Sequence, residues 1–380
     1  MKSILLVAAE NSAENYAVQV VREFTKKRLP VRFFGIGGDR LGQAGMDIRV
    51  HNRTLAIVGI IEILAHLRKI NRAMRQLLRE ARRTNAAAAL LIDYPDFNLR
   101  LAKKLKKAGI PVYYYISPTV WAWRYSRVRV IRRWVDHLFV IFPFEVPIYQ
   151  RENIPFTYTG HPLLGQVKPR RGRLEYRRRR GVSRNEKLIA LLPGSRPAEV
   201  RRLLPAMTAA LERLRGEFPV KAFILRARNI EFDTLRFRGR GGSPWTILDQ
   251  SESYDLLHAA DAVITTCGTS NLEAALLGAP FVALYRVNRL SYLLGRGLVR
   301  ISLYSIVNIL AGKEVVRELI QDECRSELIY RQTKKILTDA GYRRTMIGEF
   351  ARIKEKLSQK LNPSRIIQEK ISADLGLRKN

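Results

Sequence analysis

Cysteine is scarce in this sequence, with only Cys267 and Cys324 among its 380 residues. Two cysteines cannot build a disulfide framework or a four-cysteine zinc site. The five histidines are scattered and show no HExxH-type spacing, so we expect no metal site and no cofactor. No apolar run is long enough to span a bilayer. The apolar run near the N-terminus is also too short for a signal peptide, and we therefore expect a cytoplasmic protein.

Several ligand-binding motifs are missing as well. There is no Walker A loop and no GxGxxG fingerprint at the start of a domain, and the short GIGG run at 35–38 lacks the third spaced glycine. Neither a zinc finger nor an RNP motif occurs, so we expect no nucleic-acid partner. Acidic residues are few, 34 against 68 Lys and Arg, which gives a net charge of +34. Such a charge favours polyanions, but composition alone does not distinguish nucleic acid, anionic lipid and phosphorylated substrates.

Apolar runs alternate with helical patterns along the chain. In the first half the runs lie at 4–8, 31–35, 87–92, 112–116 and 137–141, and in the second half at 188–192, 222–225, 246–248, 262–266 and 280–285. This alternation predicts an α/β fold with parallel sheets covered by helices. A Gly-, Pro- and Arg-rich stretch near 160–187 separates the halves. We therefore expect two Rossmann-like domains, 1–165 and 166–345, facing a central cleft, and a helical segment, 346–380, that packs on the first domain or on a partner chain.

Ligands in parallel sheets bind at the carboxyl ends of the strands, where Glu10, Asp93 and Ser117 fall. Asp93, in IDYPDFN, is a candidate general base for an attacking hydroxyl. A metal pair with Asp96 is disfavoured by the three-residue spacing and the lack of further ligands. The simplest alternative is that Asp93 only accepts hydrogen bonds from loop amides.

The stretch SPTVWAWR, residues 117–124, is dense in aromatic and charged side chains. Trp121, Trp123 and Arg124 are suited to stacking on a sugar and holding a phosphate. Two tryptophans so placed are more commonly core residues, and this alternative stays open.

Two loops of the second domain have the character of phosphate-binding turns. The first holds Gly194, Ser195 and Arg196 before Pro197, with Ser195 as the expected N-cap; the alternative is an ordinary turn with a surface arginine. The second runs through Gly268, Thr269 and Ser270 into a helix that carries Glu273. Glu273 is placed to accept hydrogen bonds from a ribose diol or, more simply, to complement the helix dipole.

The segment 60–83 has apolar residues at helical spacing with many basic residues between them. This pattern predicts a basic amphipathic helix in a membrane interface, with Arg68, Lys69, Arg72 and Arg75 facing an anionic surface. In most helices such a stripe is simply core, which is the competing interpretation. The apolar and basic segment 285–310 is a second candidate membrane contact.

Together, nine segments resemble the lipid-A-disaccharide synthases, inverting glycosyltransferases of the GT-B fold. They occur in the family's order: VGIIEIL (58–64), IDYPDFN (92–98), YYISPTVWAWR (114–124), FPFE (142–145), TGHP (159–162), LLPGSRPAEV (191–200), CGTSNLEAALLGAP (267–280), YRVNRLSY (285–292) and VNILAGKEVVRELIQDE (307–323). The resemblance implies that UDP-2,3-diacylglucosamine donates its sugar to 2,3-diacylglucosamine 1-phosphate (lipid X). The products are a β-1,6-linked disaccharide 1-phosphate and UDP, in lipid A biosynthesis. It also implies a metal-independent reaction by a peripheral protein on the inner face of the bacterial inner membrane.

The same resemblance assigns roles to individual residues. Asp93 matches the family's essential aspartate and Arg196 its essential arginine near the nucleotide phosphates. The nucleotide-sugar side comprises Gly194, Ser195, Arg196, Gly268, Thr269, Ser270, Glu273, Arg286 and Asn308. The acceptor side comprises Glu10, Ser12, Glu14, Asn98, Ser117, Trp121 and Trp123. Whether the chain forms a homodimer is left open.

The first loop departs from the family's pattern, G-E-x-S-G-D. Glu10 and Ser12 match, but the two glycines are Ala9 and Ala13, and the aspartate is Glu14. If Ala13 requires a positive φ, its methyl group costs roughly 1 kcal/mol or more. Two alternatives therefore remain: another GT-B transferase or paralogue with an altered acceptor site, and a polyanion-binding protein without activity. Asp93, Arg196 and Glu273 together favour the enzyme.

Overall fold

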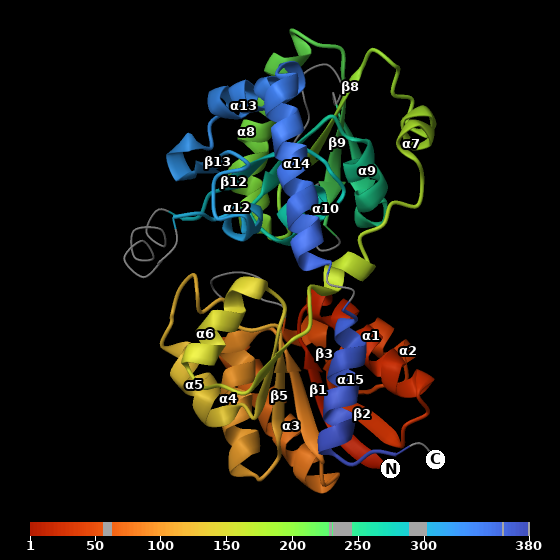
Figure 1. Cartoon of the computed structure of the whole chain (residues 1–380), viewed down its shortest axis with the longest axis vertical. Helices are drawn as coiled ribbons and strands as arrows, with labels where there is room; N and C mark the ends of the chain where they lie inside the picture. Colours follow the sequence, from red (N-terminus) through yellow and green to blue (C-terminus); the bar gives the residue numbers. More distant parts are fainter. Residues whose placement is uncertain (56–62, 228–229, 231–244, 289–301, 359–360, 379–380) are drawn as a thin grey trace. The chain divides into compact units, whose positions relative to one another are not determined.

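The structure, a computed structural model, describes residues 1–55, 63–227, 230, 245–288, 302–358 and 361–378. The chain divides into two compact units, each an α/β domain (Figure 1). Unit 1 comprises 1–162 and 358–380, and unit 2 comprises 163–357. The expected boundary at 165 lies three residues further along the chain than the observed one. The expected segment 346–380 is shared between the units.

Unit 1 is built on a seven-stranded parallel sheet with the order β3-β2-β1-β4-β5-β6-β7. The strands are β1 (Lys2–Ala8), β2 (Val31–Gly37), β3 (Asp47–His51), β4 (Ala88–Ile92), β5 (Val112–Tyr115), β6 (His137–Val140) and β7 (Phe156–Tyr158). The five predicted runs of this half are confirmed as strands. The two edge strands, β3 and β7, were not predicted, because their half-buried residues form no continuous apolar run.

Helices cover both faces of this sheet. They are α1 (Asn11–Lys26), α2 (Asp39–Gln43), α3 (Ile63–Arg83), α4 (Pro95–Lys107), α5 (Arg127–Trp134), α6 (Val146–Arg151) and α15 (Pro363–Asp374), with 3-10 turns η1 (Asn52–Leu55) and η2 (Pro143–Glu145). The 3-10 turn η3 (Pro162–Gly165) begins at the last residue of the first segment of unit 1 and continues into unit 2. Neighbouring strand residues face opposite ways. Tyr114 therefore joins the core under α3, α4 and α5, whereas the ring of Tyr115 meets Tyr16 of α1 with centroids 6.4 Å apart.

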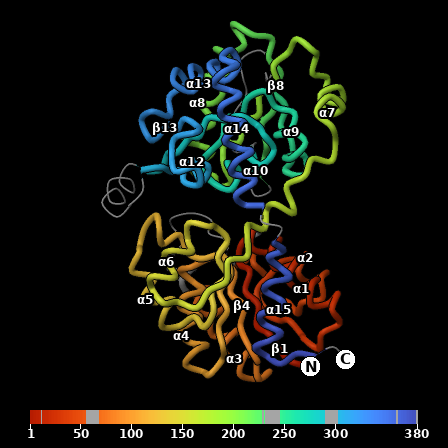
Figure 2. Tube along the Cα trace, in the orientation of Figure 1, coloured from red at the N-terminus to blue at the C-terminus, as the bar shows by residue number. Residues whose placement is uncertain are grey.

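The C-terminal helix α15 packs against α1 in unit 1, so the two ends of the chain lie side by side (Figure 2). Tyr113 of β5 donates a hydrogen bond to Asp374 of α15 at 2.7 Å, and Lys2 donates to the carbonyl of Leu375. The preceding helix, α14 (Ala340–Leu357), belongs to unit 2. Residues at the end of the chain thus complete the fold of the first domain.

Unit 2 has a six-stranded parallel sheet with the order β10-β9-β8-β11-β12-β13. Its strands are β8 (Lys187–Leu192), β9 (Val220–Arg226), β10 (Trp245–Asp249), β11 (Ala262–Thr266), β12 (Phe281–Tyr285) and β13 (Glu318–Ile320). Its other helices are α7 (Arg173–Arg179), α8 (Pro197–Arg215), α9 (Ser253–Ala259), α10 (Thr269–Leu276), α12 (Ile306–Ala311) and α13 (Ser326–Thr338), with 3-10 turns η5 (Gln250–Glu252) and η6 (Gln321–Glu323). The five predicted strands are confirmed, and the short edge strand β13 was missed.

Helix α3 corrects part of the membrane prediction. Ala73, Met74, Leu77 and Ala81 are buried in the core of unit 1, so this part of the apolar stripe is not a membrane face. Ile60 and the side chains of 63–67 lie outside the described residues, as does 289–301 of the second candidate contact. The basic side chains from Arg68 onward are exposed. Within the described residues, none of the helices is long and apolar enough to cross a membrane.

Candidate functional site

Asp93 follows the last residue of β4, at the carboxyl edge of the unit 1 sheet. Its φ of 52° and the 46° of Tyr94 place two consecutive non-glycine residues in the left-handed region. The carbonyl of Asp93 is held from two sides, by Tyr114 Oη at 2.6 Å and by Asn98 Nδ2 at 2.7 Å. Asn98 also donates to the carbonyl of Ile92 at 3.2 Å. These bonds fix the turn between β4 and α4, and with it the direction of the Asp93 carboxylate.

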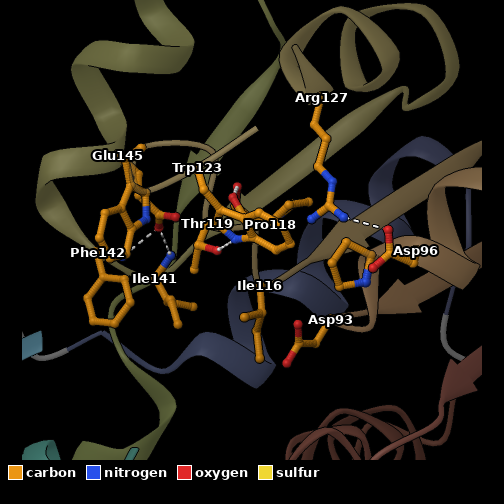
Figure 3. Close-up of a pocket in the computed structure, with 13 residues that line it drawn as sticks. Asp93, Asp96, Ile116, Pro118, Thr119, Trp123, Arg127, Ile141, Phe142 and Glu145 are labelled. Carbon is orange, nitrogen blue, oxygen red and sulfur yellow. Dashed lines mark hydrogen bonds and ion pairs between the residues drawn. The ribbon is translucent and has the colours of Figure 1, made fainter. Parts of the chain in front are cut away.

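Asp93 borders a cavity of about 230 Å³ at the carboxyl ends of β4, β5 and β6. The side chains shown in Figure 3 line it: Asp93, Pro95, Asp96, Ile116, Ser117, Pro118, Thr119, Trp121, Trp123, Arg127, Ile141, Phe142 and Glu145. The structure thus brings together the candidate base Asp93 and three residues that the family resemblance assigned to the acceptor side, Ser117, Trp121 and Trp123. Asn98 does not line the cavity, since its amide is used behind Asp93.

The electrostatic setting of Asp93 suits proton transfer. Burial, and to a smaller extent the nearby carboxylate of Glu10, raise the pKa of Asp93 to about 6, although a hydrogen bond from the backbone of Tyr94 opposes the shift. A carboxylate with a pKa near 6 is ionised at neutral pH and yet accepts a proton readily. The interpretation of Asp93 as a mere acceptor for loop amides does not account for its place on a cavity.

Glu145 is a cavity residue that the sequence analysis did not select. It is buried and accepts the backbone N–H groups of Phe142, at 3.0 Å, and Ile141, at 3.2 Å. Burial raises the pKa of Glu145 to about 8, although those two bonds oppose the shift. Its motif, FPFE, stands out in the sequence only through the family resemblance, because nothing in the sequence shows that this glutamate is buried.

The tryptophans of SPTVWAWR lie on the cavity wall. Trp123 donates through Nε1 to Thr119 Oγ1 at 3.1 Å, and two guanidiniums stack over its ring, those of Arg124 at 4.5 Å and Arg127 at 5.1 Å. Trp121 packs edge-on against Phe144 with centroids 5.1 Å apart. Ser117 shares a short hydrogen bond with buried Tyr149. The alternative that both tryptophans are ordinary core residues is wrong, because both are partly exposed and line the cavity.

The first loop is less altered than its sequence suggests. Ala9 and Ala13 have negative φ, so the methyl groups cause no backbone strain. Glu14 is buried and accepts hydrogen bonds from the amides of Arg40, at 3.0 Å, and Leu41, at 3.2 Å, and from Asn52 Nδ2 at 3.1 Å. The Glu14 carboxylate therefore accepts the free amides of the first turn of α2. Glu10 and Ser12, by contrast, are exposed.

The first loop of unit 2 leads from β8 into α8. Gly194 has a φ of 117°, a backbone conformation that residues with a side chain rarely adopt, so the turn favours glycine. The N-cap is Arg196 and not Ser195, which corrects the prediction from sequence. The Arg196 guanidinium is 76% exposed and pairs with Glu199 at 3.1 Å. A pair so exposed contributes little to stability, and Arg196 is available to an anion.

The second loop connects β11 to α10, with Gly268 as the extended N-cap and Thr269 as the first helical residue. Ser270 and Thr265 share a hydrogen bond of 3.0 Å between their hydroxyls. Glu273 lies in the second turn and accepts a hydrogen bond from Tyr254 Oη at 3.2 Å. Burial raises the pKa of Glu273 to about 7, although the hydrogen bond from Tyr254 opposes the shift. Its position beyond the first turn weakens the explanation that Glu273 only complements the helix dipole.

Asn308 and Arg286 lie in different surroundings. Both polar atoms of the buried Asn308 amide are used within the fold: Nδ2 donates to Glu318 and the carbonyl of Val316, and Oδ1 accepts from Val315 and Val316. Asn308 therefore joins α12 to β13. Arg286 follows the end of β12 and is partly exposed.

No group of three or more His, Cys, Asp or Glu side chains suited to holding a metal ion occurs within the described ranges.

Comparisons with known proteins agree with the geometry. The family described as "Lipid-A-disaccharide synthetase" matches residues 4–370. The chain is 39% identical to the lipid-A-disaccharide synthase of Geobacter sulfurreducens over 93% of this chain and 92% of that protein. It is 40% identical to the one of Nitrosococcus oceani over the same shares of the two chains.

Solved structures show the fold at much lower identity. MurG of Acinetobacter baumannii is 14% identical with a TM-score of 0.57, and its alignment covers 98% of this chain and 100% of MurG. The UDP-GlcNAc 2-epimerase of Neisseria meningitidis is 12% identical with a TM-score of 0.68, over the same shares. The fold is thus the GT-B fold, with two Rossmann-like domains, as the sequence predicted.

The pKa of Asp93 generates a stability prediction. Because that pKa is about 6 in the folded protein against an ordinary 3.8, the folded state binds the proton more tightly. Stability should therefore fall as the pH rises from 3.8 to about 6, and the loss should be complete above this window. Asp93→Asn removes this loss. The free energy of unfolding of the variant, relative to that of wild type, should therefore be about 1–3 kcal/mol higher at about pH 8 than at about pH 4.

Urea titrations of both proteins at the two pH values measure this difference. Ser117→Ala, which alters a neighbouring wall residue without an ionisable group below pH 8, serves as the control and should leave the pH dependence as in wild type. If the difference in free energy of unfolding between Asp93→Asn and wild type is the same at both pH values, the raised pKa of Asp93 is contradicted.

Proposed function

This chain belongs to the lipid-A-disaccharide synthase family, and we propose that it carries out the family's transfer with Asp93 as the base. The donor is UDP-2,3-diacylglucosamine and the acceptor is 2,3-diacylglucosamine 1-phosphate. The single observation that supports this role is the carboxylate of Asp93, fixed at the edge of a cavity with its pKa raised to about 6. The negative φ of Ala13 supports the proposal, because it removes the backbone strain expected from an alanine at this position.

The proposed step is a single displacement. Asp93 takes the proton of the acceptor's 6-hydroxyl as its oxygen bonds to the anomeric carbon of the donor. The bond from that carbon to the diphosphate oxygen breaks, and UDP leaves with the electron pair. Attack opposite to the leaving group inverts the anomeric centre, which gives the β-1,6 linkage.

Unit 2 supplies the proposed groups for the departing diphosphate. Arg196 offers a planar fork of donors at the start of α8, and the helix N-termini at Arg196 and Gly268 carry partial positive charge. Glu273 is proposed to accept hydrogen bonds from the ribose. We propose that these groups stabilise the leaving charge without a metal ion.

We further propose that the protein binds the inner face of the bacterial inner membrane peripherally, through charge. The adjacent helices α3, α4 and α5 expose a row of basic residues, which we call the basic face: Arg68, Lys69, Arg72, Arg75, Arg79, Arg82, Arg83, Arg100, Lys103, Lys104, Lys106, Lys107, Arg129, Arg132 and Arg133. Since Met74 and Leu77 are core, the attraction rests on these cations rather than on apolar insertion at that part of α3.

Substitutions at Asp93 and Arg196 should separate catalysis from nucleotide binding. Asp93→Asn should lower the transfer rate by about 10²–10⁴-fold, because a positioned base is lost. Its affinity for UDP should stay unchanged. Arg196→Ala should weaken UDP binding by roughly 1.5–3 kcal/mol, because a charge-assisted contact is lost. Calorimetric titration with UDP and an assay of UDP release measure the two effects.

Arg201→Ala is the matched control for Arg196, since Arg201 is exposed on the same helix one turn further on. It should bind UDP like wild type. Equal UDP affinity in Arg196→Ala and wild type would remove Arg196 from the nucleotide site. If the folded Asp93→Asn variant transfers the sugar at nearly the normal rate, Asp93 is not the base.

Chelation should leave the reaction intact. If helix amides and Arg196 stabilise the leaving diphosphate, transfer in excess EDTA should proceed at the rate seen without it. A rate that collapses in EDTA and returns with Mg²⁺ or Mn²⁺ would show that a metal takes part.

Charge reversal on the basic face should release the protein from membranes. Replacement of Arg68, Lys69, Arg72 and Arg75 by glutamate should abolish co-sedimentation with anionic liposomes, since each basic residue near such a surface contributes about 1 kcal/mol. UDP affinity should not change. The charge-matched control replaces four exposed basic residues of unit 2: Arg178, Arg179, Arg184 and Lys356.

The control variant should still sediment. If both variants are released equally, net charge and not this face governs binding. If wild type ignores anionic liposomes at low salt, the membrane proposal fails.

A further inference from the structure

One wall of the cavity beside Asp93 carries cationic side chains that the proposed proton transfer does not use. The Arg127 guanidinium lies between the ring of Trp123 and the carboxylate of Asp96 (Figure 3). Arg127 Nη2 is 2.5 Å from Asp96 Oδ1, and Arg124 Nη1 is 3.3 Å from the same oxygen. Two guanidiniums thus share one carboxylate oxygen and one aromatic ring.

The members of this cluster differ in how firmly they are held. Arg127 begins α5 and its side chain is 9% exposed, whereas the side chain of Asp96 is 67% exposed. Trp123 is fixed under both arginines by its hydrogen bond to Thr119 at 3.1 Å. A ligand can therefore replace Asp96 in this cluster, because the exposed Asp96 side chain can rotate into solvent at little cost. The buried Arg127 side chain cannot move away in the same manner. Removal of Asp96 from the cluster leaves two adjacent positive charges: Arg127, which lines the cavity, and Arg124, which stacks beside it on Trp123.

Such a pair of planar donor forks fits a phosphate monoester better than a carboxylate. The monoester carries up to two negative charges and three terminal oxygens, and arginine binds such oxygens in bidentate geometry. A single carboxylate balances only one of the two cations. The chemistry of the wall therefore favours a ligand with a terminal phosphate.

The rest of the cavity indicates what bears that phosphate. Trp121, Ile116 and Phe142 offer apolar surface of the kind that packs on a sugar ring, and Asp93 stands on the same cavity. The volume of about 230 Å³ is below the roughly 300–1,000 Å³ of pockets that enclose a drug-sized ligand. It admits a sugar headgroup and leaves acyl chains outside. The ligand is thus a sugar with a hydroxyl at Asp93 and a phosphate at the arginines.

We propose that Arg127 and Arg124, stacked on Trp123, bind the phosphate of the acceptor in place of Asp96, and that they select the phosphorylated acceptor over its phosphate-free form. This assignment rests on the proposed function and adds to it the group that sets acceptor specificity. Arg127 and Arg124 act on the bound acceptor, and Asp93 acts on its hydroxyl.

The test compares two acceptors, 2,3-diacylglucosamine 1-phosphate and 2,3-diacylglucosamine without the phosphate, in detergent free of phospholipid. Wild type should prefer the phosphorylated acceptor in kcat/KM by about 10- to 100-fold, the range of charge-assisted contacts. Arg127→Gln should lose most of this preference, because its rate falls with the phosphorylated acceptor and hardly changes with the other. The KM for the donor should stay as in wild type.

Arg124→Gln is the second variant, and it should reduce the preference by several-fold. Arg124 is 50% exposed, so its replacement does not endanger the fold as that of Arg127 does. The matched control is Arg213→Gln, since the guanidinium of Arg213 also stacks over an aromatic ring, that of Tyr330 at 4.7 Å, but lies in unit 2 and does not line the cavity. It should retain the full preference.

Each outcome bears on the assignment. A merely structural role for Arg127 would lower transfer to both acceptors alike and leave the preference intact, which would overturn the proposal. An unchanged preference in Arg124→Gln would also overturn it, even where Arg127→Gln does not fold. Wild type that uses both acceptors equally well refutes phosphate selection and leaves the proposed transfer standing. Wild type that uses neither acceptor refutes the proposed function itself.

Discussion

The turn between β4 and α4 is the constraint on which the candidate site depends. A left-handed backbone at Asp93 and Tyr94 directs the carboxylate to the cavity, and such a conformation costs about 1–3 kcal/mol per residue. Asn98 and Tyr114 oppose that cost by holding the Asp93 carbonyl. Four of the eight described non-glycine residues with positive φ, Asp93, Tyr94, Ile116 and Arg124, border the cavity or adjoin its lining. Backbone strain is thus concentrated where the chemistry is proposed.

The two units contribute different physical means of handling charge. In unit 1, burial raises the pKa of the Asp93 and Glu145 carboxyl groups toward neutral pH. In unit 2, the glycine turn at Gly194 places exposed Arg196 at the start of a long helix, where an anion is favoured. The excess of basic residues adds a third element, the exposed basic face of unit 1. One chain thereby combines a proposed proton acceptor, a proposed anion site and a basic surface that we propose meets anionic lipid.

Much of the fold follows from local sequence. Ten apolar runs predicted ten strands, and nine of these are central strands of a parallel sheet, which are typically buried on both faces and apolar throughout. The tenth, β10, lies at a sheet edge and was found because its run 246–248 is apolar enough to notice. The strands β3, β7 and β13 escaped prediction because edge strands need no such run. Asp93 and Arg196 were also visible in the sequence, since each follows a strand at the edge where parallel sheets bind ligands. The family resemblance then favoured these two residues over their neighbours as catalytic candidates.

Other features were decided only by tertiary structure, because they depend on which distant groups meet. Glu14 matched an acceptor-side position, yet three donors from Arg40, Leu41 and Asn52 engage it at the start of α2. From the sequence, Met74 and Leu77 were compatible both with a membrane face and with a core. The structure shows that they belong to the core of unit 1. The sequence by itself determined how the central strands and their helices alternate along the chain and which residues follow the strand ends, because these features depend on neighbours along the chain. Burial, pKa and hydrogen-bond partners required the folded chain, because Asn98, Tyr114 and Arg127 reach Asp93 and Asp96 only through the packing of β4, β5, α4 and α5.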